Sequence, residues 1–431
     1  MIWDKEKECI SRKDLMQLQL ERLQSTIHRV YKNVPFYRKM FDRVGIDPDS
    51  FSSLEDIKKI PFTTKNDLRE NYPYGLFAVP LREVVRIHTS SGTTGMPIVV
   101  GYTKNDIKIW TEVVARILTA GGITKDDVVQ IAFSYGLFTG AFGFHYGAEK
   151  IGASVIPVSI ENPKKQVKIL QDYKTTAIVS TPSYALLIAN TIIELGINPN
   201  SLSLKYGLLG AEPWSEQMRK EIEEKLKIVA TDNYGLTEVM GPGVAGECLY
   251  KNGLHINEDH FLVEIIDPES LQSVQEGEVG EVVITTLTKE AFPILRFRTG
   301  DLTRFIVGDC PCGRTFRRID RIMGRTDDMI IIKGVKIFPS QIEAILYETE
   351  GAHPNFQIIL DREAGVDRMT VLLEMSEFIF SDVMKEQDML VKQIKKRLLE
   401  ELGIDTEVRL VEKRSLERLE GKIRRVIDKR E

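Results

Sequence analysis

The sequence predicts an α/β fold: a large N-terminal domain with parallel βαβ layers and a β-rich subdomain, then a small mobile α+β C-terminal domain. Three observations support this. Between residues 84 and 300, apolar strand-like runs alternate with amphipathic helical patterns, which is typical of a parallel sheet covered by helices. Over residues 254–306, turn residues and strand-like alternation replace most helical patterns. After Gly324 a second series of strands and helices begins.

The N-terminal domain is expected to begin with helices over residues 12–44, where apolar residues recur at helical spacing and Pro35 interrupts the run. Short apolar runs then predict strands over 84–87, 128–132, 153–158, 177–180 and 206–209. Amphipathic patterns between them predict helices over 164–173, 184–195 and 215–226.

The β-rich subdomain is expected over about 245–320, with its clearest strand pair at 278–285. The C-terminal domain follows, so we expect a division into residues 1–326 and 327–431. Its apolar patterns predict strands and helices, in the order strand 329–332, helix 339–347, strands 356–360 and 370–375, helix 383–402, strand 407–411 and a basic tail.

Composition limits the class of protein. The 431 residues are 42% hydrophobic and 28% charged with a net charge of −5, which is ordinary for a globular protein and argues against nucleic acid or an anionic membrane as the main partner. The charged N-terminus lacks the apolar region of a secretory signal, and no apolar run has the length of a membrane helix. Four cysteines are too few for a disulfide scaffold, so a reducing cytoplasm is expected.

A glycine- and hydroxyl-rich segment is the most informative motif. It runs Ser90-Ser91-Gly92-Thr93-Thr94-Gly95 and follows the apolar run at 84–87. Glycines allow close approach of the backbone, and hydroxyls with free N–H groups can surround an anion, so this segment is a candidate phosphate loop. It lacks the Gly-Lys-Ser/Thr ending of the common P-loop, and a solvated loop is the alternative interpretation.

Two further motifs carry polar groups after glycine turns. Thr237 can donate to a phosphate and Glu238 can hold Mg²⁺, although this motif taken alone favours a turn with a helix cap and an acidic first turn. Asp301 follows Gly300 and can accept two ribose hydroxyls, with an ordinary turn as the alternative. Lys422 lies in the basic tail, which alone would indicate a solvated end.

Taken together and in this order, these motifs resemble the adenylate-forming enzymes: acyl-CoA synthetases, peptide-synthetase adenylation domains and beetle luciferases. The resemblance extends from about residue 84 to the C-terminus and is nearer to the phenylacetate–CoA ligase family. The segments that carry it are His-x-Ser-Ser-Gly-Thr-Thr-Gly from His88, Tyr-Gly-Leu-Phe-Thr-Gly at 135–140, Gly-Ala-Glu-Pro at 210–213 and Asp-Asp-Met-Ile-Ile-Ile-Lys-Gly-Val at 327–335.

The resemblance implies roles in binding ATP or AMP. Residues Ser90 to Gly95 would hold the β- and γ-phosphates, Thr237 would contact the α-phosphate and Glu238 would bind Mg²⁺. The adenine would be lined by Gly210, Ala211, Glu212 and Pro213, with Asn233 and Tyr234 on its faces and Gly235 beside the nucleotide and the acyl group. Asp301 and Arg325 would bind the ribose.

The resemblance also implies a two-step reaction. Lys422 would bridge the carboxylate and the α-phosphate during adenylation, and Lys333 with Gly334 would lie on the face that replaces it during thioester formation. Asp327 would be the hinge between these two states. One departure from many superfamily members is Ile98, which stands where a lysine follows the loop.

The expected function is therefore an ATP- and Mg²⁺-dependent ligase that converts an aryl carboxylic acid such as phenylacetate to acyl-AMP and then to the CoA thioester. Tyr135, Phe138 and Gly140, together with Ala211 and Gly235, are the candidate acyl-binding residues; core packing is the alternative interpretation of the aromatic ones. An acceptor other than CoA, such as a carrier protein or a deazaflavin cofactor, stays open, as does a non-catalytic nucleotide-binding protein. The resemblance suggests a homodimer.

Three cysteines and a histidine form a second candidate site. Cys248, His255, Cys310 and Cys312 fall in the β-rich region, and three thiols with one imidazole match a closed structural zinc site. The one-residue spacing of Cys310 and Cys312 is tighter than usual, His260 is a weaker substitute ligand, and ordinary thiols are the alternative.

Overall fold

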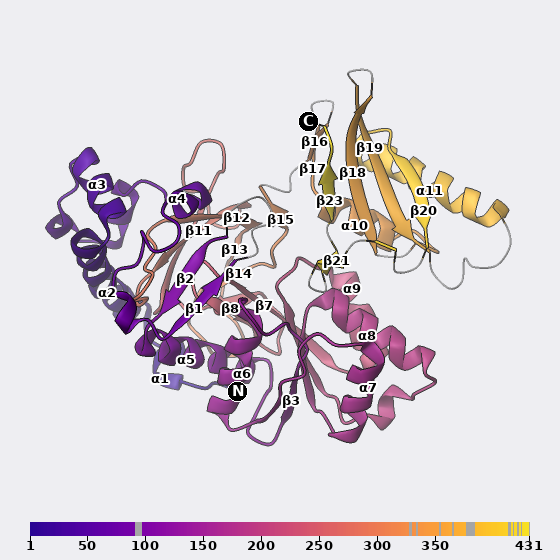
Figure 1. Ribbon diagram of the computed structural model, residues 1–431, viewed down its shortest axis with the longest axis horizontal. Coiled ribbons are helices and arrows are strands. Elements are labelled where there is room, and N and C mark those ends of the chain that lie inside the picture. Colours follow the sequence, from indigo (N-terminus) through magenta and orange to yellow (C-terminus); the bar gives the residue numbers. More distant parts are fainter. Residues whose placement is uncertain are drawn as a thin grey trace. The chain divides into compact units, whose positions relative to one another are not determined.

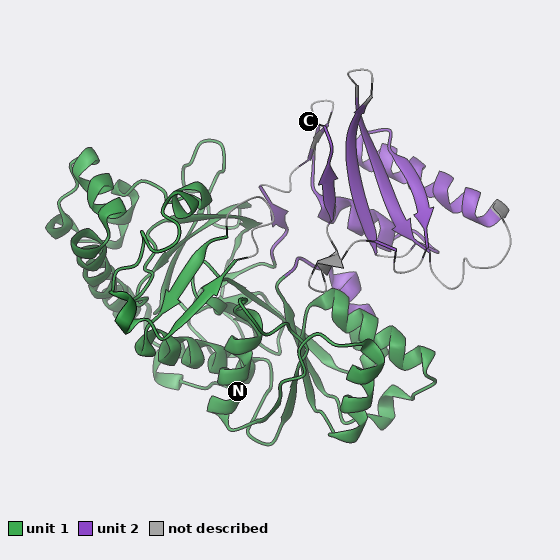
Figure 2. Cartoon of the chain, viewed as in Figure 1, with its two compact units in different colours: residues 1–211, 222–321 green, residues 212–221, 322–431 purple. Residues whose placement is uncertain are grey.

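The computed structural model describes residues 1–90, 97–326, 330–332, 335–352, 355–363, 366–375, 384–412, 415–416, 418–419, 422–423 and 425–430. The chain divides into two compact units (Figure 2): residues 1–211 with 222–321, and residues 212–221 with 322–431. Asp327, the residue predicted as a hinge, lies outside the described residues. The mixed α/β class that the sequence predicts is confirmed.

The first unit begins with helices α1 (Lys5–Glu8), α2 (Arg12–Asn33), α3 (Pro35–Val44) and α4 (Lys65–Glu70). Ser11 caps α2 by accepting a hydrogen bond from the Asp14 amide. Pro35, which lacks an N–H group, stands at the start of α3 and separates it from α2, as its position in the sequence predicts. Short 3₁₀ helices lie at Pro48–Ser50, Leu54–Lys59, Leu81–Glu83 and Pro199–Ser201.

A nine-stranded sheet forms the centre of this unit, and Figure 1 labels β3, β7, β8, β13 and β14 of it. The strand order is β13-β14-β9-β8-β7-β6-β5-β3-β4. Strands β4, β3, β5, β6 and β7 are parallel, and the remaining pairs are antiparallel. The strands are β3 (Val128–Ile131), β4 (Ser154–Ile156), β5 (Ala177–Ser180), β6 (Tyr206–Gly210), β7 (Val229–Leu236), β8 (Gly241–Glu247), β9 (Leu254–Ile256), β13 (Phe305–Ile306) and β14 (Arg318–Ile319).

Helices cover this sheet in packed pairs. Contacts join α5 (Lys104–Ala120) to α6 (Gly140–Ile151), and α7 (Pro163–Asp172) to α8 (Pro182–Glu194), as Figure 1 shows. Helix α9 (Glu216–Leu226) precedes β7. The β5 strand is buried along its whole length, which explains its continuous apolar sequence.

The β-rich stretch differs from the expectation of one small subdomain. Strands β10 (Phe261–Ile266), β11 (Gly280–Thr286) and β12 (Phe297–Thr303) pair antiparallel in a second sheet, while β8, β9, β13 and β14 extend the large one. The segment expected as a strand pair at 278–285 forms the single strand β11. A separate hairpin of β1 (Arg86–Thr89) and β2 (Val99–Tyr102) flanks the predicted phosphate loop.

The second unit is an α+β fold with its own apolar core. Its sheet has the order β20-β19-β18-β23, in which β23 lies parallel to β18. Its elements are β15 (Gly324–Arg325), β16 (Ile330–Ile332), β17 (Val335–Ile337), α10 (Pro339–Tyr347), β18 (Phe356–Glu363), β19 (Val366–Glu374), α11 (Met384–Leu402), β20 (Glu407–Val411), β21 (Arg418–Leu419), β22 (Lys422–Ile423) and β23 (Val426–Asp428). Strand β23 falls in the segment that the sequence indicated only as a basic tail.

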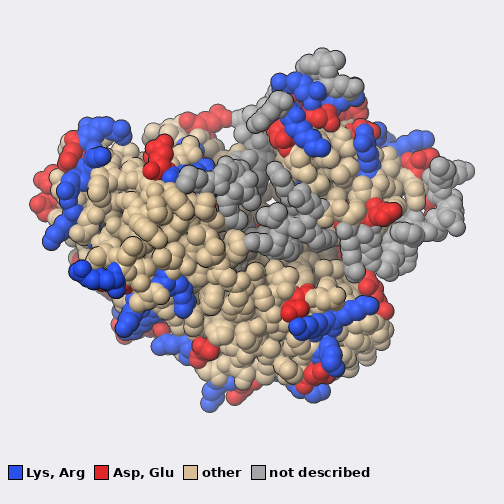
Figure 3. Space-filling model, viewed as in Figure 1, with Lys and Arg blue, Asp and Glu red and all other residues tan. Residues whose placement is uncertain are grey.

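The surface carries charges of both signs. On the face drawn in Figure 3, lysine and arginine side chains alternate with aspartate and glutamate along the rim of the first unit. Within the described part of the chain, no helix has the length and apolar character needed to cross a bilayer.

Candidate active site and a Cys/His cluster

The β1–β2 hairpin closes the base of the predicted phosphate loop. The Ser90 amide donates to the Ile98 carbonyl over 3.0 Å, and the Ile98 amide donates to the Ser90 hydroxyl over 3.3 Å. Thr89 pairs with Val99 one step below. The two ends of the loop are thus held together, which is the arrangement a short anion-binding loop needs. Residues Ser91, Gly92, Thr93, Thr94 and Gly95 lie outside the described residues.

The predicted adenine residues of the first unit lie at the ends of two parallel strands. Gly210 on β6 pairs with Asn233 on β7, and the side-chain Nδ2 of Asn233 donates to the Leu209 carbonyl over 2.5 Å. A Cβ atom on Gly210 would lie 2.3 Å from the Asn233 carbonyl oxygen, so only glycine fits there. Ala211 follows with a φ of 69°. In open parallel sheets, ligands bind outside such carboxyl ends. Glu212 and Pro213 belong to the other unit.

A buried hydrogen bond connects the large sheet to the second sheet. The Tyr234 hydroxyl on β7 donates to the Asp301 carboxylate on β12 over 2.6 Å, and both side chains are buried. The Asp301 amide in turn donates to the Thr299 hydroxyl over 3.0 Å. This short contact to a charged acceptor fixes the orientation of the carboxylate predicted to bind ribose. Arg325, predicted beside it, lies on β15 of the second unit.

The turn between β7 and β8 carries Thr237 and Glu238. The Thr237 hydroxyl lies 3.2 Å from that of Thr139, the residue before α6, and Glu238 is buried. At Gly235 an added Cβ would lie 2.0 Å from the Gly241 carbonyl oxygen, so the sharp entry into this turn requires glycine. The sequence did not lead us to Thr139. Its position between Phe138 and Gly140, two candidate acyl-binding residues, could have indicated it.

Aromatic side chains gather around the candidate acyl residues. The rings of Tyr135 and Phe142 meet edge to face at 5.2 Å, and Phe142 stacks with Tyr146 at 6.2 Å. The Arg86 guanidinium lies over both of the latter rings, at 5.1 and 4.9 Å from their centroids. The sequence analysis did not include Arg86, Phe142 or Tyr146, because aromatic residues on a helix indicate core packing equally well.

Tyr135 also begins a chain of polar groups. Its hydroxyl lies 3.0 Å from Nδ1 of His145, and Nε2 of that imidazole lies 3.1 Å from the Glu149 carboxylate. Burial raises the pKa of Tyr135 above its usual value, so the phenol stays protonated. Phe138 is half-buried, and Gly140 is the first residue of α6.

The predicted residues of the second unit are only partly described. Lys422 lies on β22 and pairs with Leu419 of β21, but its side chain is outside the described residues. Lys333 and Gly334 also lie outside them.

The Cys/His cluster does assemble. The ligand atoms of Cys248, His255, Cys310 and Cys312 all lie within 4.8 Å of one another. The sulfurs of Cys248 and Cys310 are 3.7 Å apart, and the sulfur of Cys312 is 3.4 Å from Nε2 of His255. Strands β8 and β9 bring Cys248 and His255 together, and the loop before β14 supplies the other two. His260 forms a different contact, with Nδ1 at 2.8 Å from the Thr288 hydroxyl.

Electrostatics within the cluster favour a thiolate. Hydrogen bonds from Cys248 and then His255 lower the pKa of Cys312, while the hydrogen bond to Cys312 and burial raise the pKa of Cys248. The fourth cysteine lies beside the cluster, where the Cys9 thiol donates to the Gly313 carbonyl over 3.2 Å. The donor set, three sulfurs and one imidazole nitrogen, is the one that zinc prefers in closed sites.

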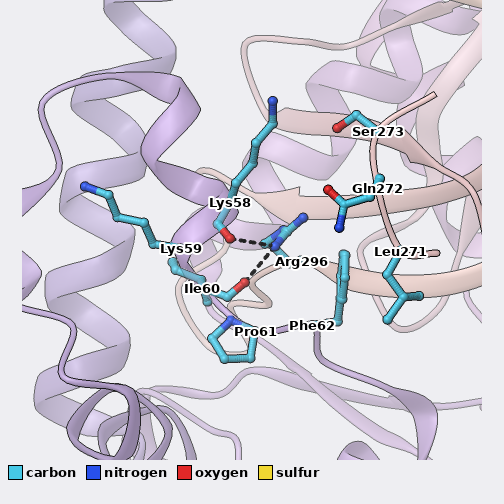
Figure 4. A pocket seen from close by; sticks show the side chains of 9 residues that line it. All are labelled: Lys58, Lys59, Ile60, Pro61, Phe62, Leu271, Gln272, Ser273 and Arg296. Atoms are coloured by element: carbon cyan, nitrogen blue, oxygen red, sulfur yellow. Dashed lines mark hydrogen bonds between the residues drawn. The ribbon is translucent and has the colours of Figure 1, made fainter. Parts of the chain in front are cut away.

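A surface pocket of about 290 Å³ lies apart from these groups (Figure 4). Arg296 contributes to its wall, but its guanidinium donates to the carbonyls of Lys58 and Ile60 and pairs with Glu264 at 2.8 Å. This arginine therefore has its own partners, and none of the described residues lining the pocket was predicted for the site.

Comparison with known proteins identifies the family. The family model described as "AMP-binding enzyme" matches residues 46–288. The family model described as "AMP-binding enzyme C-terminal domain" matches residues 334–430. Phenylacetate-coenzyme A ligase of Thermus thermophilus is 46% identical over 100% of both chains. That of Escherichia coli is 48% identical over 98% of this chain and 97% of its own. A solved 2-hydroxyisobutyryl-CoA ligase in complex with 2-HIB-AMP is 30% identical with a TM-score of 0.92, covering 100% of this chain and 92% of that one.

The chain belongs to the phenylacetate–coenzyme A ligase family of AMP-binding, adenylate-forming enzymes. The resemblance read from the motifs is thus confirmed. The reaction class is an ATP-dependent acid–thiol ligation, in which a carboxylic acid becomes acyl-AMP and then the thioester of CoA.

Proposed function

We propose that the acid activated by this ligase is phenylacetate or a closely related aryl acid. The observation that carries the proposal is the 46–48% identity, over nearly the full length, to four phenylacetate-coenzyme A ligases. The edge-to-face pair of Tyr135 and Phe142 supports it, because such rings suit an aromatic ligand. Tyr135, Phe138 and Gly140 would line the acyl pocket, with Ala211 and Gly235 leaving space where larger side chains would intrude.

The nucleotide would lie across the carboxyl ends of β6 and β7. We assign the β- and γ-phosphates to residues 90–95 and the α-phosphate to Thr237. The Thr237 hydroxyl would be oriented by its hydrogen bond with the Thr139 hydroxyl. Asn233 and Tyr234 would flank the adenine, with Gly210, Ala211, Glu212 and Pro213 beside it. The hydrogen bond from Tyr234 would hold Asp301 toward the ribose hydroxyls, with Arg325 as its companion.

In the first step, a carboxylate oxygen of the acid attacks the α-phosphorus of ATP, and the bond to pyrophosphate breaks. Glu238 would hold Mg²⁺, which neutralises phosphate charge when bound. Lys422 would bring its ammonium to the carboxylate and the α-phosphate, and holding both reactants in line removes an entropic cost.

In the second step, the CoA sulfur attacks the carbonyl carbon of acyl-AMP, and the bond to AMP breaks. Lys333 and Gly334 would then face the site, with Asp327 as the hinge. The proposed acceptor is CoA, because relatives at this identity are CoA ligases.

We also propose one structural zinc ion per chain at Cys248, His255, Cys310 and Cys312. Filling all four positions with protein ligands leaves none for a substrate, so the role would be to tie β8 and β9 to the loop before β14. A cytoplasmic homodimer completes the proposal, and light scattering of the purified chain checks the dimer.

The test is pyrophosphate release with ATP, Mg²⁺ and CoA over a panel of aryl and aliphatic acids. The proposal predicts release with phenylacetate and AMP as the co-product. Release with short aliphatic acids but with no aryl acid would refute the assigned substrate class while leaving the reaction class intact.

A further inference from the structure

Glu281 is a buried glutamate that the assigned site does not use. It lies on β11 opposite Leu302 of β12, and its side chain is 2% exposed. One carboxylate oxygen, Oε2, accepts Nε and Nη2 of Arg298 over 3.0 and 2.5 Å. The other oxygen, Oε1, accepts the backbone amide of Gly300 over 3.1 Å. The carboxylate thus contacts two residues of the segment that leads into Asp301.

A β-bulge interrupts the pairing of β11 with β12 at this point. Residues 298–302 of β12 lie opposite residues 281–283 of β11, so five residues face three. Gly300, in the middle of the bulge, has a φ of 80°, in the left-handed region that favours glycine. Bulges beside a site change the direction in which a side chain points, and Asp301 is the residue that follows Gly300.

Side chains on both strands hold the bulge in this shape. The Thr299 hydroxyl donates to the Val282 carbonyl over 2.8 Å and accepts the Asp301 amide over 3.0 Å. Between these two contacts, the Glu281 carboxylate accepts the Gly300 amide. The backbone conformation that directs the Asp301 side chain therefore depends on one hydroxyl and one carboxylate.

A second glutamate–arginine pair in the same sheet shows what is particular to Glu281. Glu264 on β10 accepts Nε of Arg296 at 3.0 Å on one oxygen and Nη2 at 2.8 Å on the other. Glu281 instead uses one oxygen for its arginine and the other for the Gly300 amide. A buried ion pair is seldom more stabilising than apolar side chains of similar volume, so stability of the fold alone does not account for Glu281.

We propose that Glu281 is a positioning residue for the Asp301 carboxylate, which it holds toward the ribose hydroxyls of ATP. Its Oε1 fixes the Gly300 amide, and the Thr299 hydroxyl fixes the next amide along the chain. The Tyr234 hydroxyl orients the Asp301 carboxylate itself at 2.6 Å. The inference rests on the proposed assignment of Asp301 to the ribose. It predicts an effect confined to nucleotides that carry ribose hydroxyls.

The test is Glu281→Gln in the full chain, because a carboxylate accepts on both oxygens whereas a primary amide accepts on only one. The glutamine would have to turn an N–H group toward either the Gly300 amide or the Arg298 guanidinium. A hydrogen bond to a charged acceptor corresponds to roughly tenfold in affinity. We therefore expect the wild type to bind MgATP at least about tenfold more tightly than the Mg²⁺ complex of 2′,3′-dideoxy-ATP, by calorimetry without acid or CoA. In Glu281→Gln, the Kd for ATP should rise about tenfold and the Kd for dideoxy-ATP should change less than about threefold.

Two further variants complete the test. Glu264→Gln is the matched control, since it changes a glutamate that pairs with an arginine of the same sheet but does not contact the bulge. It should bind both nucleotides as the wild type does. Glu281→Met combined with Arg298→Met replaces the ion pair by apolar side chains, a change that buried pairs often tolerate, and removes the acceptor of the Gly300 amide. It should show the same selective loss of ATP binding, and it decides the question if Glu281→Gln does not fold.

The outcomes separate this inference from the proposed function. Equal weakening of ATP and dideoxy-ATP in the Glu281 variants would show a purely structural glutamate and overturn the inference. Unchanged ATP binding in these variants would overturn it too, while a wild type that prefers ATP would leave the proposed function standing. A wild type that binds the two nucleotides equally would overturn the ribose role of Asp301 and the inference with it. A wild type that binds neither nucleotide would overturn the proposed function itself.

Discussion

Replacing one ligand of the Cys/His cluster tests the zinc proposal most sharply. In a tetrahedral site with Zn–S of about 2.3 Å and Zn–N of about 2.0 Å, two sulfurs lie about 3.8 Å apart and a sulfur and a nitrogen about 3.5 Å apart. The observed separations are 3.7 Å for Cys248 and Cys310 and 3.4 Å for Cys312 and His255. These two separations therefore match those of a zinc site, and all four ligand atoms lie within 4.8 Å of one another.

The size of the effect follows from linkage. Free zinc at a thousand times its Kd stabilises a folded protein by about 4 kcal/mol. At about 2 °C per kcal/mol for a large domain, removing zinc should lower the unfolding temperature by about 8 °C. We expect wild-type protein to contain close to one zinc per chain by elemental analysis. The Cys310→Ser variant should contain little zinc, and its unfolding temperature should be lower by at least about 8 °C.

Cys9→Ser is the matched control, because its thiol contacts Gly313 beside the cluster without belonging to it. It should keep its zinc and its unfolding temperature. A fully folded, active wild type without metal, or a Cys310→Ser variant with undiminished zinc, would refute the reasoning.

Three further predictions concern the nucleotide site and the fold. Lys422→Ala should nearly abolish acyl-AMP formation but spare thioester formation from supplied acyl-AMP; equal loss in both half-reactions would contradict its assignment. Tyr234→Phe removes a hydrogen bond to the charged Asp301, worth about 1.5 kcal/mol or roughly tenfold in ATP affinity, and unchanged binding by calorimetry would argue against the ribose role. Burial lowers the pKa of His88 from 6.5 to about 4, so the unfolded chain binds more protons than the folded one between these pH values. The free energy of unfolding should therefore fall by up to about 3 kcal/mol as the pH drops through that window. Thermal scans of His88→Gln over pH 7 to 4 should show a shallower decline than the wild type.

Local sequence patterns predicted most elements because each was encoded over a few neighbouring residues. The continuous apolar run of β5 requires burial on both faces, and Pro35 alone separates two helices. Long-range pairing was not visible in this way. Nothing in the sequences of β9 and β14 indicates that these strands extend the large sheet. Strand β23 was not predicted, because its sequence is part of a basic tail and its partner β18 lies far away in the chain.

The candidate sites show the same limit. Residue types were sufficient to select Cys248, His255, Cys310 and Cys312, because so few thiols and imidazoles occur in the chain. Phe142 and Tyr146 were not selected, since aromatic residues on a helix indicate core packing equally well.

The most direct test of the central claim is the product analysis of a reaction with ATP, Mg²⁺, CoA and phenylacetate. The account predicts acid-dependent pyrophosphate release with equal amounts of AMP and an aryl-CoA thioester. Release of ADP instead of AMP, or no thioester from any aryl acid, would contradict it.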